Sequence, residues 1–265
     1  MLPPTVTSRE AMQDRTHEAI VSEQFSPQAQ SYLTSAVHAQ GEDLAQMARI
    51  VGDRPQAIAL DLGCGGGHAS FLLAPLVQKV VAYDLSEAMV EMVGTEAVRR
   101  GLNNLEARQG LVERLPWADA AFDVVVSRYS AHHWHDIAAG LREARRVLKT
   151  GGLAVFMDVA APGNALLDTW LQSLELLRDP SHVRDYSVEE WTGMLISAGF
   201  RPQTVSHFRL RLEFSSWVRR MNTPEAHVQA IRSLQARAGA EVTRHFEIEP
   251  DGSLTFDTML ISAEG

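Results

Sequence analysis

The sequence contains a single cysteine, Cys64, among its 265 residues. One thiol cannot form a disulfide within the chain, so the hydrophobic core must hold the fold, and this composition suits a reducing compartment. We interpret Cys64 as a small residue in a tight turn. No run approaches the ~18 apolar residues that a membrane-spanning helix requires, and the N-terminus lacks the apolar core of a secretory signal. We therefore expect a cytoplasmic protein without a membrane span.

The sequence has fewer basic than acidic residues. The 24 lysines and arginines stand against 33 acidic residues, which gives a formal net charge of −9. A protein that binds duplex DNA or RNA needs a basic face to displace counterions, so we expect no nucleic-acid partner. Hydrophobic residues make up 45% of the chain and prolines number only 11, as in a folded globule rather than a disordered chain.

A glycine-rich turn follows the first predicted strand. It contains Gly63, Gly65 and Gly67, and glycines allow a nucleotide-like ligand to approach the backbone closely. The dinucleotide pattern G-x-G-x-x-G would need a glycine at His68. Asp61, at the end of the strand, would repel a pyrophosphate but suits a cationic ligand. S-adenosylmethionine has no phosphate and carries an ammonium and a sulfonium, so the turn favours it over a dinucleotide.

A second acid ends the next predicted strand. Asp84 lies about 20 residues beyond the first glycine, the spacing at which Rossmann-type units present a carboxylate to ribose hydroxyls. The alternative is that Asp84 only caps the following helix, but Ser86 is better placed for that role. We therefore predict that Asp84 binds the ribose.

These motifs and several later segments resemble the class I S-adenosylmethionine-dependent methyltransferases, within the group related to ubiquinone and menaquinone C-methyltransferases. The segments that carry the resemblance are Asp61–Gly67, Asp84–Met89, Glu113–Trp117, Phe122–Val126, Arg128–Trp134 and Arg146–Gly152. Two more, Asp179–Arg184 and Glu189–Trp191, resemble a narrower group of YcgJ-like bacterial methyltransferases. The resemblance extends from about Phe25 to the C-terminus. It implies S-adenosylmethionine as cofactor but says little about the methyl acceptor.

The resemblance also implies a set of cofactor-binding residues. These are Asp61, Gly63, Gly65, Gly67, Asp84, Leu85, Met89, Leu111 and Val112, with Phe25, Tyr32 and His38 as candidates to line the site from the N-terminal segment. One position departs from the family. Relatives commonly have Gly-Asp-Ala-Glu in the adenine loop, where this chain has Leu111 in place of the aspartate. Losing one hydrogen bond to a charged group is worth roughly 1.5 to 3 kcal/mol, although the Val112 N–H could still bond the adenine ring.

Three histidines are candidates for the acceptor side. Methyl transfer requires the nucleophile to lie in line with the methyl group at roughly 3 to 3.5 Å, and sometimes requires a base. His132 and His133 follow a strand that ends near Ser127, and His182 lies in a loop that could close over the same pocket. Purely structural hydrogen bonding is the alternative. Adjacent histidines without accompanying Cys, Asp or Glu spacing do not make a tetrahedral site, so the sequence predicts no metal.

Strands and helices alternate through the middle of the chain, which predicts parallel strands with right-handed crossovers. We expect a Rossmann-like α/β fold, and the resemblance implies a seven-stranded, mostly parallel sheet with an antiparallel last strand. Residues 1–50 should form a helical N-terminal cap that packs on the sheet or covers the cofactor. Residues 51–265 should form the methyltransferase domain, with helical insertions near 163–186 and 215–240. Residues 246–249 and 254–261 should form a terminal hairpin.

The expected activity is methyl transfer from S-adenosylmethionine to a small aromatic or partly apolar molecule. C-methylation is the first choice because of the quinone-pathway resemblance, with O- or N-methylation next. The sequence indicates no oligomeric state. One alternative is a protein that holds the cofactor without transferring the methyl group, in which side chains would fill the acceptor space beside His132 or His133. An NAD-dependent dehydrogenase is disfavoured by Asp61 and by the missing third glycine.

Overall fold

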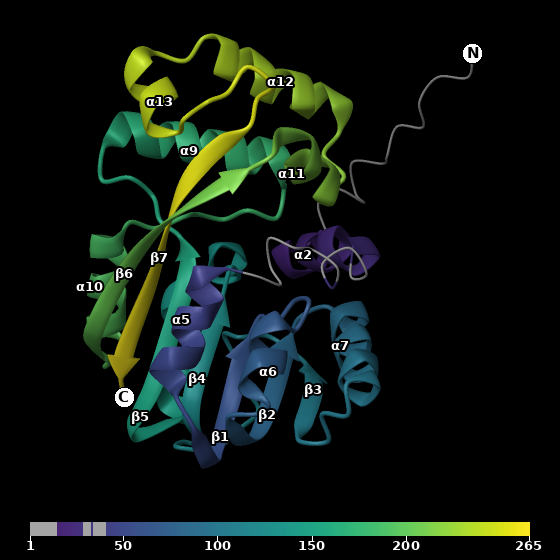
Figure 1. Cartoon of the computed structure of the whole chain (residues 1–265), viewed down its shortest axis with the longest axis vertical. Helices are drawn as coiled ribbons and strands as arrows, with labels where there is room; N and C mark the ends of the chain where they lie inside the picture. The colour runs from purple at the N-terminus through teal and green to yellow at the C-terminus, as the bar shows by residue number, and fades with distance from the viewer. Residues whose placement is uncertain (1–14, 29–32, 34–40) are drawn as a thin grey trace.

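The computed structural model describes residues 15–28, 33 and 41–265. Its centre is a seven-stranded sheet of order β3-β2-β1-β4-β5-β7-β6 (Figure 1). The strands are β1 (Arg54–Leu62), β2 (Val77–Asp84), β3 (Leu105–Gln109), β4 (Phe122–Arg128), β5 (Leu148–Val159), β6 (Arg201–Leu212) and β7 (Leu254–Glu264). The first five are parallel, whereas β7 runs antiparallel to both β5 and β6. The predicted fold class is confirmed.

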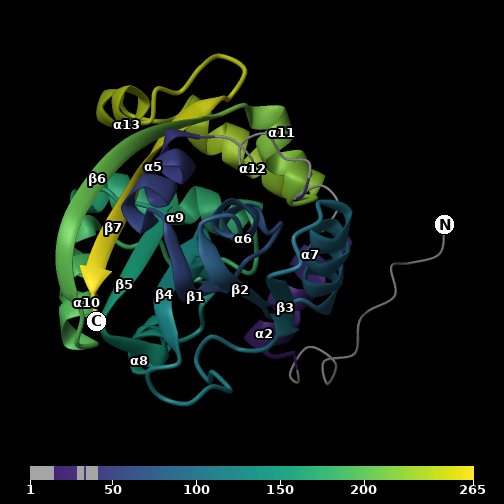
Figure 2. The ribbon, with the colours of Figure 1, turned by 60° about the horizontal axis from the view of Figure 1, so that its bottom comes forward.

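Helices cover both faces of the parallel part of this sheet (Figure 2). One face carries α5 (Glu42–Val51), α6 (His68–Leu73) and α7 (Glu87–Arg99), and the other carries α8 (Ile137–Val147) and α10 (Val188–Ser197). Successive strand residues point to opposite faces. In β1, Ala59 therefore packs with Leu44 and Met47 of α5, while Leu60 packs in the core that contains Leu141 of α8 and Trp191 of α10.

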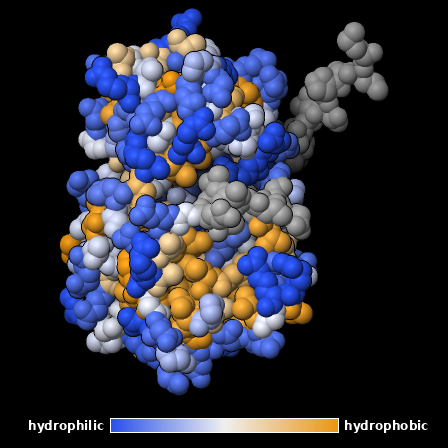
Figure 3. All heavy atoms as spheres, in the orientation of Figure 1, coloured by the Kyte–Doolittle hydropathy of each residue, from blue (hydrophilic) through white to orange (hydrophobic). Residues whose placement is uncertain are grey.

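A helical lobe stands beyond the carboxyl ends of the parallel strands, at the top of Figure 1. It consists of α9 (Ala165–Arg178), α11 (Phe214–Arg220), α12 (Glu225–Ala236) and α13 (Ala240–His245), joined by the near ends of β6 and β7. Its core includes Leu174, Trp217, Ile231 and Phe256. The outer surface of the lobe seen in Figure 3 is mostly hydrophilic, as expected if its apolar residues face inward.

The N-terminal helix α2 (His17–Phe25) and the short η1 (Ser26–Gln28) lie between the sheet and the helical lobe (Figure 1). Their contacts reach both sides. Gln24 Nε2 donates to the carbonyl of Met221 next to α11, and the hydroxyls of Ser26 and Ser86 are 3.0 Å apart. The α2 helix buries none of its own residues fully, and these contacts link α2 and η1 to the helical lobe and to the start of α7.

The predicted terminal hairpin is wrong. Residues 246–249 follow α13 directly and form no strand, and the antiparallel partners of β7 are β5 and β6. The side chain of Phe246 is buried in the helical lobe, with its ring stacked on Trp170 at 5.6 Å. Within the described ranges, no helix is long and apolar enough to cross a membrane.

Candidate active site

The glycine turn joins β1 to α6 at the carboxyl edge of the sheet. Gly63, Gly65 and Gly67 have φ values of +65°, +49° and +77°, in the left-handed region that other residues avoid. A Cβ on Gly63 would lie only 1.7 Å from Ser130 Oγ, whereas a Cβ on Gly65 would meet no atom within 4 Å. Gly63 is therefore required for packing of the turn, and Gly65 leaves open space above it.

Asp84, at the end of β2, lies against this turn. Its Oδ2 accepts a hydrogen bond from the Gly65 N–H at 2.8 Å, and its Oδ1 accepts one from the Ser86 N–H at 2.9 Å. Burial raises the pKa of Asp84, and the backbone donors of Ser86 and Gly65 oppose that rise. Ser86 is the N-cap of α7, through its Oγ. The capping role therefore falls to Ser86, as predicted, and the second lone pair of each Asp84 oxygen can accept from a ligand.

Asp61 is the other acid at the strand ends. It is 1% exposed, and its Oδ2 accepts from Ser70 Oγ in α6 at 2.6 Å. Burial raises the pKa of Asp61 to about 6, against the opposing effect of the Ser70 bonds. A cationic ligand group close to Asp61 would favour its ionised form.

A glycine-turn cavity of about 980 Å³, its open mouth included, lies above these residues. Of the predicted cofactor residues, Asp61, Gly63, Gly65, Asp84, Leu85, Met89, Leu111 and Val112 line it. Gly67 does not line the cavity. It faces the core instead, where a Cβ built on it would lie 2.9 Å from Phe71 and from Val93. Phe25 lines the cavity, and Tyr32 and His38 fall outside the described residues.

The adenine loop contributes another carboxylate to this cavity. The resemblance implies an aspartate at the position of Leu111, whose carbonyl accepts from the Tyr83 hydroxyl at 3.4 Å. Glu113 lines the same cavity two residues further on. Glu113 could therefore provide the acceptor that Leu111 lacks. The cofactor set predicted from the sequence leaves out several further lining residues on other elements, namely His17, Val21, Arg128, Tyr129, Ser130 and Trp134.

A second, helical-lobe cavity of about 580 Å³, likewise including its opening, adjoins the first. Phe25, Tyr129 and His133 line both cavities. The remaining walls of the helical-lobe cavity come from the short helix η2 (Ala131–His133), the ends of β5, β6 and β7, the helices α9 and α11, and the loop between α9 and α10. They are His132, Val159, Glu175, Arg178, Asp179, Asp185, Leu210, Leu212, Trp217, Arg220 and Phe256.

His132 belongs to the short helix η2 (Ala131–His133) and forms a close pair with Asp158 at the end of β5. Its Nδ1 is 2.5 Å from Asp158 Oδ1. Burial lowers the pKa of His132, but the charge and hydrogen bond of Asp158, together with the charges of Asp185 and Glu175, outweigh this effect and raise the pKa to about 9. Asp158 therefore favours the protonated imidazole, in which Nδ1 donates to Asp158 Oδ1.

His133 lies at the junction of the two cavities. Its Nδ1 is 3.1 Å from the carbonyl oxygen of Ser181, to which it can only donate, and this contact leaves a lone pair on Nε2. Nε2 is 3.9 Å from Asp179 Oδ2. Burial, followed by the positive charge on His132, lowers the pKa of His133 to about 4. His133 is therefore favoured in its neutral form, and within the described part of the chain no hydrogen bond occupies its Nε2.

His182 lies behind the other two histidines and lines neither cavity. Its Nε2 is 2.9 Å from Gln172 Oε1 in α9, and burial lowers its pKa to about 2. The three predicted histidines thus lie together, since the rings of His132 and His182 are 5.8 Å apart and those of His132 and His133 are 4.2 Å apart. Only His132 and His133 face a cavity.

The fold, the glycine turn and the carboxylate at the end of β2 define a class I methyltransferase. A methyltransferase domain family model matches residues 60–156. The uncharacterised protein YafE of Escherichia coli is 49% identical over 201 residues, which cover 76% of this chain and 97% of YafE. The chain belongs to the S-adenosylmethionine-dependent methyltransferase family, and S-adenosylmethionine is its cofactor.

Two further relatives carry the name methyltransferase. The uncharacterised methyltransferase YcgJ of Bacillus subtilis is 37% identical over 200 residues, 76% of this chain and 79% of YcgJ. The crystal structure of YcgJ superposes with a TM-score of 0.81 at 32% identity, covering 84% of this chain and 97% of that one. A demethylmenaquinone methyltransferase of Chlorobaculum parvum is 32% identical over 120 residues, 45% of this chain and 47% of the relative.

Replacing Asp84 by alanine should weaken the binding of S-adenosylhomocysteine by ~1.5 to 3 kcal/mol, about 10- to 150-fold, because a charged acceptor for ribose hydroxyls is lost. Isothermal titration calorimetry measures this effect. Asp123→Ala is the matched control, since Asp123 also accepts a backbone N–H, from Ile58 at 2.9 Å, but does not line the glycine-turn cavity. Equal losses in both variants, or NAD binding more tightly than S-adenosylhomocysteine to the wild type, would contradict the ribose assignment.

Proposed function

We propose that the chain transfers the methyl group of S-adenosylmethionine to a small, partly apolar molecule that binds in the helical-lobe cavity. The observation that carries this proposal is the junction of the two cavities at Phe25, Tyr129 and His133. A protein that only held the cofactor would have side chains in the space beside His133. The adjoining cavity instead provides room for a second molecule there.

The walls of the helical-lobe cavity favour an acceptor with an apolar body and a polar end. The apolar and aromatic lining comes from Phe25, Tyr129, Val159, Leu210, Leu212, Trp217 and Phe256. The polar lining gathers around His132, His133 and Asp185. Rings pack well against such aromatic walls, and the convergent polar groups can orient a hydroxyl or a carbonyl. We infer an aromatic or partly apolar acceptor with at least one oxygen or nitrogen substituent.

C-methylation is our first choice of reaction, with O- or N-methylation next. The partial relative named demethylmenaquinone methyltransferase supports a ring acceptor. When bound, the cofactor supplies an electrophilic methyl group on a sulfonium. The chain has to hold the acceptor in line with that group, exclude water, and accept a proton where the acceptor loses one. α2 provides a cover over the strand ends, and His133 Nε2 can accept the proton.

The test is a methyl-transfer assay with the full chain and S-adenosylmethionine over quinols, catechols and small amines, read by mass spectrometry of the products. We expect at least one small molecule to gain a methyl group with turnover, and the position of that group separates C- from O- and N-methylation. Transfer confined to a protein or nucleic-acid substrate, with none to any small molecule, would contradict the proposal.

A further inference from the structure

Negative charge accumulates at the buried end of the helical-lobe cavity. Asp158, Asp179, Asp185 and Glu175 are 1 to 6% exposed. The guanidinium groups that face the same space belong to Arg178 and Arg220. Arg178 is already engaged, because it donates to Glu175 Oε2 at 3.1 Å and to the carbonyl of Trp217 at 3.2 Å. These four carboxyl groups outnumber the cationic side chains beside them, which are the two guanidiniums and the His132 imidazole, and charge in a buried space must be compensated.

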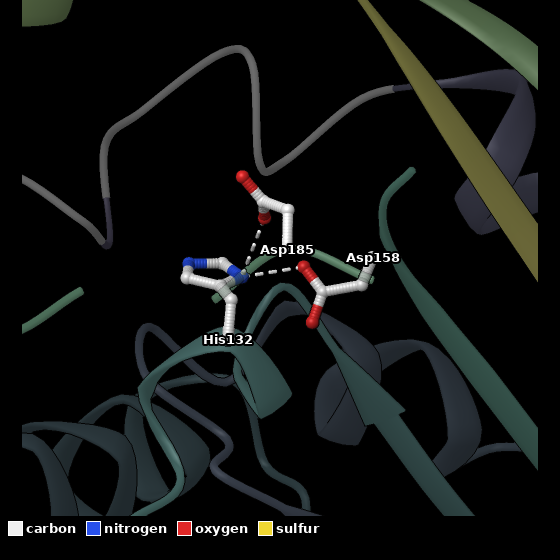
Figure 4. A group of neighbouring side chains, drawn as sticks. All are labelled: His132, Asp158 and Asp185. Carbon is white, nitrogen blue, oxygen red and sulfur yellow. Dashed lines mark hydrogen bonds and ion pairs between the residues drawn. The ribbon is translucent and has the colours of Figure 1, made fainter. Parts of the chain in front are cut away.

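Two of these carboxyl groups, those of Asp158 and Asp185, each present Oδ1 to His132 and, among the described residues, keep Oδ2 without a hydrogen bond. Within residues 15–28, 33 and 41–265, no hydrogen bond reaches Oδ2 of Asp158 or of Asp185. Asp158 is 2% exposed and Asp185 is 1% exposed, so solvent does not reach these oxygens freely. Buried polar atoms are normally satisfied, and an unsatisfied one calls for an explanation such as a missing ion. Figure 4 shows Asp185 and Asp158 directed toward the same nitrogen of His132.

The donor atoms of these three residues are already gathered. His132 Nδ1, a carboxylate oxygen of Asp158 and one of Asp185 all lie within 4.8 Å of one another. Nδ1 is 2.5 Å from the Asp158 oxygen and 4.0 Å from the Asp185 oxygen. A first-row divalent ion lies about 2.0 to 2.2 Å from each donor atom. Displacements of the carboxyl oxygens on the order of 1 Å would therefore let the three donors share an ion.

We propose that His132, Asp158 and Asp185 form a binding site for a first-row divalent metal ion such as Mn²⁺ or Zn²⁺. One imidazole with two carboxylates is a mixed nitrogen and oxygen set, which suits these ions better than Ca²⁺ or Mg²⁺, whose preferred ligands are all oxygen. His132 and Asp185 line the helical-lobe cavity, so the ion would face the space that the proposed function assigns to the acceptor. The ion site itself does not depend on that function.

Outer contacts hold the three ligands in place, as is usual around metal sites. The carbonyl of His132 accepts from the Val183 N–H at 2.8 Å, which ties η2 to the loop that carries Asp185. The side-chain amide of Gln172 in α9 makes two hydrogen bonds with the backbone of Asp185. Gln172 Nε2 donates to the Asp185 carbonyl at 2.8 Å, and Gln172 Oε1 accepts from the Asp185 N–H at 3.1 Å. The Val159 N–H donates to Asp158 Oδ1 at 2.9 Å.

The sequence predicted no metal because the adjacent histidines lack acidic residues at ligand spacing. The structure assembles the site from three separate segments: η2, the end of β5 and the loop before α10. Asp158 and Asp185 are 26 and 53 positions from His132 along the sequence. Asp158 had a recognisable signal, since it ends a strand at the carboxyl edge, whereas Asp185 had none.

The test uses untagged full-length protein stripped with EDTA and titrated with MnCl₂ or ZnCl₂, followed by calorimetry and, for Mn²⁺, by electron paramagnetic resonance. We expect a single ion per chain for the wild type. Asp185→Asn keeps the shape of the side chain but removes an anionic ligand, so affinity should fall more than the roughly 10- to 100-fold that loss of an outer-shell partner costs. Binding of S-adenosylhomocysteine should be unchanged in this variant, which would confirm that it folds.

Glu175→Gln is the matched control. It removes one negative charge from the same cavity but none of the three ligands, so the stoichiometric site should persist. Equal losses in Asp185→Asn and Glu175→Gln would indicate diffuse attraction of cations and would overturn the proposal, as would a wild type that binds neither ion stoichiometrically. A methyl-transfer assay that fails would not affect this result, because the readout is metal binding alone.

Discussion

Replacing Gly65 by valine should abolish the binding of S-adenosylhomocysteine while leaving the fold intact. A Cβ at this position would meet no atom of the described residues within 4 Å, so the first atom of the new side chain fits without a clash. The added side chain would extend into the glycine-turn cavity, where the backbone must approach the ligand closely. Calorimetry should detect no binding, and the circular dichroism spectrum should match that of the wild type.

The backbone strain of this variant needs a separate control. A β-branched residue at φ +49° is strained, at a cost on the order of 1 to 3 kcal/mol. Gly101 has φ +72°, also has no atom within 4 Å of a built Cβ, and lies in the turn after α7, away from the cavity. Gly101→Val should therefore lose similar stability but bind S-adenosylhomocysteine normally. Normal binding by Gly65→Val itself would show that the turn does not contact the ligand.

Most of the residues that the sequence predicts for the cofactor gather at one cavity because their determinants are local. The glycine turn, the acids that end β1 and β2, and the Ser86 cap lie within about 25 residues, and each follows from strand periodicity or from a backbone requirement. Eight of the predicted cofactor residues line the glycine-turn cavity. Gly67 differs because its role is to pack against Phe71 and Val93, a contact that no spacing rule reveals.

The acceptor side could not be predicted to the same depth because it is built from contacts between distant segments. The sequence indicated His132 and His133, but the loop carrying Asp179 and Asp185 reaches them only after α9 has crossed the strand ends. The hydrogen bond from the Val183 N–H to the His132 carbonyl fixes that approach.

The incorrect prediction of a terminal hairpin also arose because contacts between distant segments are not visible in the sequence. Residues 246–249 alternate like a strand, but packing of Phe246 with Trp170 and Phe256 keeps them in the helical lobe.

Once an acceptor is known, replacing His133 by alanine should lower turnover by roughly 10²- to 10⁴-fold, the usual contribution of a positioned general base. His133 lies where the two cavities meet, and its Nδ1 contact with the Ser181 carbonyl leaves Nε2 available. Affinity for S-adenosylhomocysteine should change far less than turnover, because Asp84 and the glycine turn would still hold the cofactor. Steady-state methyl transfer and calorimetry on the same preparation measure both quantities.

Two further variants separate a base from a merely structural histidine. His133→Asn can still donate from its amide to the Ser181 carbonyl but has no Nε2, so its turnover should be as low as that of His133→Ala even though the loop contact is kept. His135→Ala removes an exposed histidine of the same segment that lines neither cavity, and its turnover should match the wild type. Recovery of turnover in His133→Asn would show that His133 acts through the loop. Methyl transfer would then depend on alignment of the acceptor alone.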